Sequence, residues 1–139
     1  MKKTSLKEVT KNISLSPLAK FSEQGNIKIL KTSSIENGKI IEEKFEKGET
    51  DKDIEKYFLK KDDIIFQAKG NKFEAVLIDK DYENLLSVQS YFNISLKKEL
   101  VNPMYLCWYL NNRISKQHFE KNSSAATVKS ITRNVLESI

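Results

Sequence analysis

Two adjacent carboxylates, Asp62 and Asp63, are the residues whose type and spacing first suggest chemistry. Metal-dependent nucleases need two or three acidic side chains that converge on one cation. Glu74 follows at a suitable distance, but Val76 occupies the position where a common nuclease pattern has a lysine. Neighbouring residues of a strand point to opposite faces, so these two carboxylates do not converge unaided. We interpret the pair as polar residues at the start of a strand.

The sequence Lys69-Gly70-Asn71-Lys72 is a second candidate, because a glycine between lysines resembles a phosphate-gripping loop. A P-loop needs several glycines before a Lys-Ser/Thr pair that opens a helix. Here one glycine lies between two β-forming runs, so we expect no nucleotide site. The two lysines and the backbone N–H groups can still contact the phosphates of a nucleic acid.

Asn102-Pro103-Met104-Tyr105 resembles the Asn-Pro-Pro-Tyr motif of adenine methyltransferases. The second proline is missing, and no Gly-rich strand–loop is present to hold S-adenosylmethionine. Asparagine as N-cap and proline at the first helical position are also a preferred way to begin a helix. We therefore interpret these residues as a helix start.

His118 and Cys107 are the only histidine and the only cysteine, so they cannot form a zinc site without carboxylates. Tyr105, Trp108 and Tyr109 have rings that can stack on bases. Their helical spacing favours packing in the core instead for most of them. The sequence shows no catalytic group, no metal site and no cofactor site, and we expect a binding protein rather than an enzyme.

Two β-forming runs surround the Lys-Gly-Asn-Lys sequence and predict a β-hairpin with a basic tip. The first run is residues 64–66 and the second is residues 73–78. In the second run, Val76 and Ile78 share one face and Leu77 points to the other.

Other segments of the first two thirds predict further strands and turns. Residues 26–35 predict a short strand that leads into a Ser-rich loop, and Asn37-Gly38 predicts a tight turn. Residues 42–53 are highly charged and contain Gly48, and we interpret them as an exposed loop or irregular extension. Residues 85–96 predict one further strand, with one face formed by Val88, Ser90, Phe92 and Ile94.

The last third predicts helices. A helix is expected from residue 103 to about residue 120, with a break allowed, followed by a small-residue loop over residues 121–127. Residues 130–136 predict a short closing helix with Ile131, Val135 and Leu136 turned inward. Strands followed by helices argue for a single α+β domain over residues 1–139, in which residues 1–25 are peripheral or poorly ordered. The longer helix is expected to bury the residues Met104, Cys107, Trp108, Leu110 and Ile114.

The charge distribution suggests an anionic partner. Residues 1–31 carry seven Lys and two Glu, residues 32–96 ten Lys and fourteen acids, and residues 97–139 seven basic and three acidic side chains. The ends are therefore basic, and together they would form a face suited to a polyanion. We expect no secretory signal and no membrane span, since no apolar run approaches about 18 residues. A lone cysteine fits a cytoplasmic protein.

These segments, in this order, resemble one target-recognition domain of the specificity (S) subunit of type I restriction–modification enzymes. The resemblance covers about residues 25 to 139. Asp62 stands where the family usually has glycine, Lys69 where it usually has arginine, and the chain stops at Ile139, where the family enters Pro-rich sequence and a long helix. The matching segments are Leu59-Lys60-Lys61-Asp62-Asp63-Ile64-Ile65-Phe66, Lys69-Gly70, Ser87-Val88-Gln89, Asn102-Pro103-Met104-Tyr105-Leu106, Ser123-Ser124-Ala125-Ala126-Thr127 and Ile131 to Ile139.

The resemblance implies a sequence-specific reader of double-stranded DNA that directs partner modification and restriction subunits, which carry the methylation and cleavage chemistry. Those subunits would dock on long helices, which this chain would need to receive from elsewhere. Lysines would neutralise phosphates, and polar loop residues would read base edges. The lysines are Lys69, Lys72, Lys116, Lys121 and Lys129, and the polar residues are Ser33, Ser34, Asn71, Gln89, Ser123 and Thr127.

Two alternatives stay open. In the first, the chain is a protein-interaction module that does not read DNA. In the second, it is a truncated relative of a specificity subunit that modulates a restriction complex. A homodimer also stays open. The net charge of +5 argues against mimicry of DNA. DNA binding would weaken strongly with salt, whereas binding to a protein partner would persist.

Overall fold

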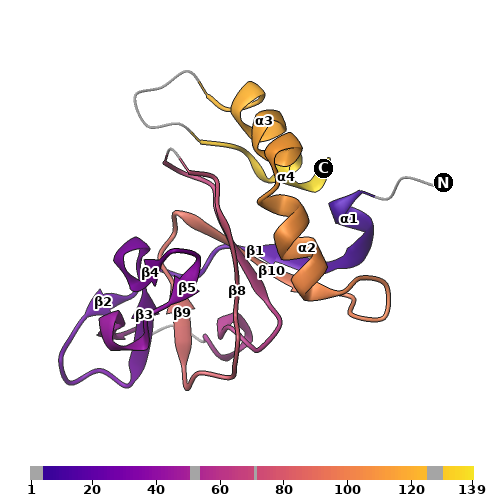
Figure 1. Ribbon diagram of the computed structural model, residues 1–139. Coiled ribbons are helices and arrows are strands. Elements are labelled where there is room, and N and C mark those ends of the chain that lie inside the picture. Colours follow the sequence, from indigo (N-terminus) through magenta and orange to yellow (C-terminus); the bar gives the residue numbers. More distant parts are fainter. Residues whose placement is uncertain (1–4, 51–53, 71, 125–129) are drawn as a thin grey trace.

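The computed structural model describes residues 5–50, 54–70, 72–124 and 130–139, and it has the α+β fold expected from the sequence (Figure 1). Sheet A is entirely antiparallel, and its strands lie in the order β1 (Thr10–Ser14), β10 (Tyr91–Leu96), β7 (Ile64–Gln67) and β8 (Ala75–Leu77).

Sheet B lies beside sheet A and contains one parallel pair. Strands β3 and β9 run parallel, with Ile29 opposite Leu86, while β6 pairs antiparallel with both β2 and β3. A separate hairpin joins β4 (Ile35–Glu36) to β5 (Lys39–Ile40) through the predicted Asn37-Gly38 turn, where both residues have positive φ. The strands of sheet B are β2 (Lys20–Phe21), β6 (Glu46–Glu49), β3 (Ile27–Leu30) and β9 (Leu85–Ser87).

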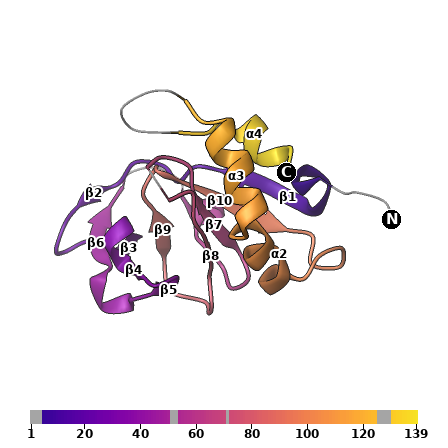
Figure 2. The same ribbon diagram turned by 45° about the horizontal axis from the view of Figure 1, so that its top comes forward.

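The helices gather on one side of sheet A, away from sheet B (Figure 2). Among the described residues, no helix is long and apolar enough to cross a membrane. The helices are α1 (Leu6–Val9), α2 (Pro103–Leu110), α3 (Arg113–Lys121) and α4 (Arg133–Glu137), and the short 3₁₀ turns are η1 (Thr32–Ser34), η2 (Glu42–Lys44) and η3 (Glu55–Tyr57).

Sheet A is buried on both faces, as alternation along β7 shows. Ile64 and Phe66 point toward the helices and pack with Phe119 of α3. Ile65 points the other way and packs with Leu85 of β9. Successive side chains of a strand face opposite sides, so a continuous apolar run fits a strand that is covered on both sides.

The β7–β8 hairpin is confirmed, with Ile65 opposite Val76. Val76 and Ile78 pack together on the face predicted for them, and Leu77 packs on the other side. Asn111 protects the free edge of β8, because its amide accepts from Ala75 N (2.8 Å) and donates to Ala75 O (2.8 Å).

The helix prediction is confirmed in its start and its break. Asn102 caps α2, its side chain accepting from Met104 N (2.9 Å) and Tyr105 N (3.3 Å). Asn112 begins α3 in the same way by accepting from Ser115 N (2.7 Å). The closing helix α4 is also confirmed, with Leu136 fully buried.

The predicted core packing of this helical region is wrong for Met104, Trp108 and Ile114, and also for Tyr105 and Tyr109, which are 59% and 36% exposed. Met104, Trp108 and Ile114 are 70%, 63% and 74% exposed, whereas Leu106 and Leu110 fill the core. Met104 and Trp108 both precede the break, so the error there is one of helical phase: the stripe of α2 that faces the core runs through Leu106, the half-buried Cys107 and Leu110.

The single strand predicted over residues 85–96 is two strands in different sheets. Val88 N donates to Leu30 O (3.1 Å) and Tyr91 N donates to Val88 O (3.2 Å), which turns the chain between β9 and β10. Apolar alternation continues through this turn, so the pattern did not reveal it.

Residues 42–53 were predicted to be irregular, yet β6 lies in the interior of sheet B between β2 and β3. Gly48 is buried there, and a Cβ atom at this position would lie 2.8 Å from Lys20 O. Glycine, taken as a loop signal, is required here by the close approach of a neighbouring strand.

The expectation that residues 1–25 are peripheral is corrected for α1 and β1. Leu6, Val9 and Ile13 are buried in the main core, and Ile13 pairs with Ile94 of β10. The segment passes from the short helix α1 directly into strand β1, so its apolar residues follow neither the helical nor the strand period throughout.

Candidate nucleic-acid interface

Segments that are distant in the sequence meet at one edge of the molecule, which we call the tip edge. It comprises residues 32–34, 88–90 and the described parts of 68–74 and 122–131. Figure 1 shows the β7–β8 loop beside the segment just before α4, where Lys69 forms a β-bridge with Ser130.

Backbone hydrogen bonds connect the neighbouring segments of the tip edge in a row. Val88 N donates to Leu30 O (3.1 Å), just before η1. Ala68 N donates to Ser90 O (2.8 Å), and Ile131 N donates to Ala68 O (3.0 Å). The turn after β9 is therefore held between the end of β3 and the β7–β8 loop, and that loop is held against the segment before α4.

Lys69 and Lys72 are exposed on the β7–β8 loop, as the sequence predicted for a basic tip. Lys69 also forms an antiparallel bridge with Ser130, which fixes its backbone against the segment before α4. Between Lys69 and Lys72 in the sequence, Gly70 has a φ of 115°, and a Cβ atom at this position would lie 2.8 Å from Gln67 Nε2. The loop therefore needs glycine at this position.

Phe73 anchors the other side of the loop. Its φ of 45° is in the left-handed region, which is a genuine outlier for a bulky residue. Its ring is buried and its centroid lies 6.4 Å from that of Phe119, which in turn lies 4.7 Å from Phe66. Core packing thus holds a strained backbone next to the exposed lysines.

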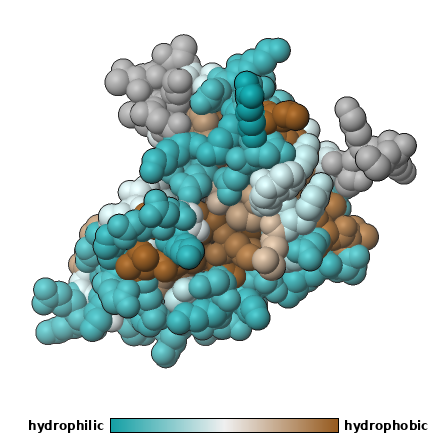
Figure 3. Space-filling model, in the orientation of Figure 1, coloured by the Kyte–Doolittle hydropathy of each residue, from teal (hydrophilic) through white to brown (hydrophobic). Residues whose placement is uncertain are grey.

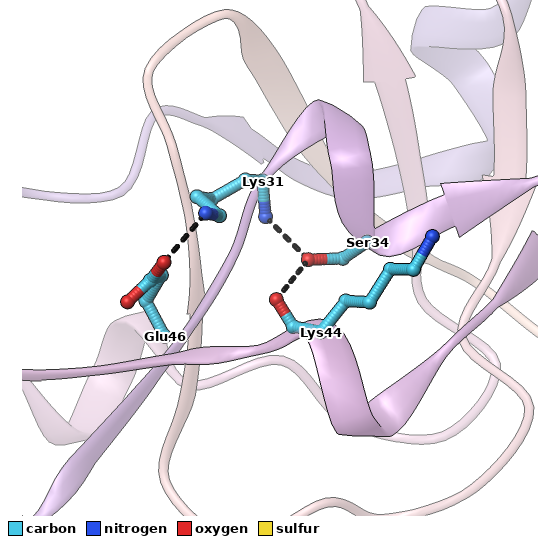
Figure 4. Close-up of polar contacts among 4 residues, drawn as sticks. All are labelled: Lys31, Ser34, Lys44 and Glu46. Atoms are coloured by element: carbon cyan, nitrogen blue, oxygen red, sulfur yellow. Dashed lines mark hydrogen bonds and ion pairs between the residues drawn. The ribbon is translucent and has the colours of Figure 1, made fainter.

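Two of the predicted base-reading residues have structural contacts instead. Ser34 is fully buried; its Oγ accepts from Lys31 N (3.0 Å) and donates to Lys44 O (3.1 Å) (Figure 4). Gln89 Nε2 donates to Ser16 O (3.1 Å). We do not retain Ser34 as a base contact, since no part of it reaches the surface, and we assign Gln89 a role in holding its turn.

A buried polar network explains why the turn at Gln89 is held firmly. Asn93 Nδ2 donates to Ser16 Oγ (2.8 Å), and Ser87 Oγ donates to Asn93 Oδ1 (2.7 Å). Ser87 N also donates to Ser16 Oγ (3.1 Å). The network joins β9 of sheet B to β10 of sheet A. Sequence reasoning missed it, although polar residues at otherwise apolar strand positions were the available signal.

Of the remaining predicted residues, four lie in the described part of the chain, on η1, on α3 and just after α3. Ser33 is exposed in η1, and Lys121 is exposed at the end of α3. Ser123 Oγ donates to Glu120 O (2.9 Å), and this residue is half-buried. Lys116 is half-buried on α3, more than one turn before Lys121. The predicted residues that lie outside the described part of the chain are Asn71, Thr127 and Lys129.

Asp62 and Asp63 lie at the opposite end of the β7–β8 hairpin, in the turn that precedes β7. Asp63 Oδ2 accepts from Lys60 N (2.9 Å), and Asp62 has a φ of 74°. Burial raises the pKa of Asp63 above its ordinary value, although Lys60 and Lys98 oppose this shift. Within the described ranges, no group of three or more His, Cys, Asp or Glu side chains could hold a metal ion. Both residues thus shape a turn, as interpreted from the sequence.

The fold is similar to that in the crystal structure of the type I restriction–modification system S subunit from M. genitalium. The TM-score is 0.61, the sequence identity is 15%, and the match covers 98% of this chain and 32% of that chain. The chain therefore spans about a third of the length of that S subunit. No protein-family model and no curated protein matches the sequence. The predicted resemblance in fold to an S-subunit domain is confirmed.

Proposed function

We propose that this protein binds double-stranded DNA through the tip edge and reads a short base sequence, as a target-recognition domain of a type I specificity subunit would. The observation that carries the proposal is the convergence of basic and polar loops at one edge of a fold that is similar to an S subunit.

Phosphate contacts would come from the lysines of the tip edge. Lys69 and Lys72 lie on the β7–β8 loop, and Lys121 is the last residue of α3. Ser130, which follows α3 in the sequence, forms a β-bridge with Lys69. Lysine side chains on separate segments can contact phosphates on both sides of a groove and so set the register of the protein on the duplex.

Base contacts would come from polar side chains between these lysines. Ser33 and Ser123 are available on described segments. In the sequence, Asn71 belongs to the loop between β7 and β8, and Thr127 follows Ser123 between α3 and α4. An asparagine can form two hydrogen bonds with adenine, and such a contact discriminates by about 1–3 kcal/mol. The fixed backbone at Gly70 and Phe73 would hold the adjacent lysines, Lys69 and Lys72, at a defined place on the tip edge.

Methylation and cleavage would belong to partner subunits, which need helices beyond the segment that this fold represents. The protein would then act in the cytoplasm as a non-catalytic reader. We place no catalytic residue, cofactor or metal ion in the proposed function.

The test is selection from a randomised duplex pool at low and at high salt, with sequencing of the bound DNA. We expect a short motif to be recovered. The double variant Lys69→Ala/Lys72→Ala should bind more weakly and should reduce the slope of log affinity against log salt by roughly 0.9 for each lost phosphate contact.

Lys61→Ala is the matched control, because Lys61 is an exposed lysine at the opposite end of the same hairpin. It should leave both affinity and slope unchanged. If Lys61→Ala weakens binding as much as the double variant does, or if no motif is recovered, the tip edge is not a sequence reader. Binding to a restriction-complex protein that persists at high salt would favour the alternative of a protein-interaction module.

A further inference from the structure

Glu74 is the only acidic residue of the tip edge, whose other side chains are basic or uncharged. It begins the return from the β7–β8 loop, where Gln67 N donates to Glu74 O (2.9 Å). Among the described residues, none forms a hydrogen bond or an ion pair with the Glu74 carboxylate. A negative charge on a surface that binds DNA repels phosphates, so an acid at this place is unfavourable unless it contacts a base.

The carboxylate of Glu74 is held in place by its neighbours. Phe73, before it, is anchored in the core, and Ala75, after it, is bound on both backbone groups by the Asn111 amide (2.8 Å each). A Cβ atom at Gly38 would lie 3.7 Å from Glu74 Oε1, so the carboxylate lies against the β4–β5 turn. A backbone that is fixed on both sides gives a contacting group one arrangement, which is what a selective site needs.

Glu74 is half-buried rather than extended into solvent. Burial raises the pKa of Tyr91 to about 12 and that of Cys107 to about 11, and the negative charge of Glu74 adds to both shifts. The charge therefore lies close enough to both side chains to act on them. In Figure 3, the surface around β8 and α2 is pale to brown within a mostly teal surround, which agrees with the lack of described polar partners for this carboxylate.

A carboxylate accepts hydrogen bonds and donates none, which restricts what it can contact on a DNA duplex. In the major groove, only cytosine N4 and adenine N6 donate, whereas guanine and thymine present acceptors that repel a carboxylate. Adenine also carries the acceptor N7 beside its amino group, and a carboxylate has no donor for it. Cytosine is therefore the base that matches this group best.

We propose that Glu74 is a specificity-determining residue of the tip edge and accepts a hydrogen bond from the N4 amino group of one cytosine in the major groove. The inference rests on the proposed function. Lys69 and Lys72, on the same loop, would contact phosphates and so offset the repulsion between the carboxylate and the duplex. An acid at this position lowers affinity for DNA in general and favours one base, and this combination increases selectivity.

The first experiment compares the full chain with Glu74→Gln in selection from a randomised duplex pool. We expect the motif of the wild type to contain cytosine at one position, and the variant to lose this preference by about tenfold while the other positions are kept. Glutamine can both donate and accept, so the variant should shift this position toward adenine. Binding of the variant to unrelated duplexes should be equal or tighter, because a negative charge has been removed.

Glu83→Gln is the matched control, because it removes the same charge from an exposed glutamate at the other end of β8, in the turn before β9. It should leave the motif unchanged. Urea unfolding of both variants would verify that each is folded.

A second measurement tests the contact itself. In the selected duplex, the cytosine is replaced by a pyrimidinone that lacks the 4-amino group. Both proteins lose affinity through the weakened base pair, but the wild type should lose about tenfold more than Glu74→Gln does. A purely structural role for Glu74 would not produce this coupling between side chain and amino group.

Three results would overturn the inference while the proposed function stands. These are a wild-type motif without a cytosine that depends on Glu74, an unchanged preference at every position in Glu74→Gln, and equal losses of the two proteins on the pyrimidinone duplex. A change of the motif in Glu83→Gln that equals the change in Glu74→Gln would also overturn it, since charge alone would then be acting. If the wild type recovers no motif, the proposed function and this inference both fail.

Discussion

At the scale of the residue, polar side chains of the tip edge that form hydrogen bonds with buried backbone groups are not available to contact DNA. Ser34 lies in a tight turn, and its hydroxyl bonds to the backbone of Lys31 and Lys44. Ser33, its neighbour, has the same chemistry but is exposed. Buried backbone groups must find partners, and short polar side chains in turns provide them. The sequence could indicate a polar loop, but not which of its two serines turns inward.

Because the pKa of Asp63 is raised, we expect the free energy of unfolding to depend on pH. Burial raises its pKa, so the folded state holds the proton more tightly than the unfolded chain does. The contribution of Asp63 to stability is then fully present below the unfolded-state pKa and is lost as pH rises through the higher folded-state pKa. Asp63→Asn keeps an oxygen that can accept from Lys60 N, and we expect it to equal or exceed the wild type in stability at neutral pH.

The measurement is urea unfolding of both proteins from acidic to neutral pH. The free energy of unfolding of the wild type, relative to the variant, should fall as pH rises through this interval, by about 1.4 kcal/mol per unit of pKa difference. A relative stability that instead rises with pH would show that the neighbouring lysines outweigh burial.

At the scale of the element, the β7–β8 hairpin was predictable because its signals are local. Ile64, Ile65 and Phe66 form a continuous apolar run, and Gly70 marks the turn. The start of α2 at Asn102 was equally local, since the cap and the proline are adjacent in the sequence. By contrast, β6 was missed because its Gly48 is explained only by strands β2 and β3, which pack on both sides of it.

The substitution Gly70→Ala tests how much the stability of the β7–β8 hairpin depends on the conformation of its tip. The φ of 115° and the approach of Gln67 Nε2 both oppose a side chain, so we expect a loss of about 1–3 kcal/mol in the free energy of unfolding. Gly38→Ala is the matched comparison, because Gly38 has a φ of 77° but its Cβ atom would have no neighbour closer than 3.7 Å.

Denaturant unfolding of the two variants would separate strain from crowding. Gly70→Ala should cost more than Gly38→Ala, and Gln67→Ala in the Gly70→Ala background should recover part of the difference. Equal costs for the two glycine variants, with no recovery, would show that Gln67 does not constrain the tip.

At the scale of the whole molecule, the order of strands and helices was enough to predict an α+β fold and its resemblance to an S-subunit domain. The division into two sheets was not predictable in this way, because it depends on partners that are far apart in the sequence. Lys28 pairs with Leu85, and Thr10 pairs with Leu96. The candidate interface follows from these pairings, since they bring η1, the turn at Gln89 and the β7–β8 loop to one edge.

The network of Ser16, Ser87 and Asn93 is expected to couple the two sheets energetically. Asn93→Ala and Ser16→Ala each leave buried polar partners unsatisfied, so each should destabilise the fold by about 1–3 kcal/mol. The double variant should lose less than the sum, with a coupling of about 0.5–3 kcal/mol in a double-mutant cycle. Leu15→Ala, at an exposed neighbouring position, is the control and should have little effect. Strict additivity of the two losses would show that the network does not act as a unit.

The pairing of β1 with β10 also governs the route by which the chain folds. The first strand finds its partner only in the segment that ends at Leu96, and β3 finds β9 only after Leu85. Contacts of such long sequence separation slow folding, because the entropy of closing a large loop is lost before the pairing stabilises the chain. During synthesis, β1 is made well before its partner exists, and Ile13 lacks its pairing partner until the chain has been made as far as Ile94. The amino-terminal strand therefore needs protection from aggregation until the segment that contains β10 has been made.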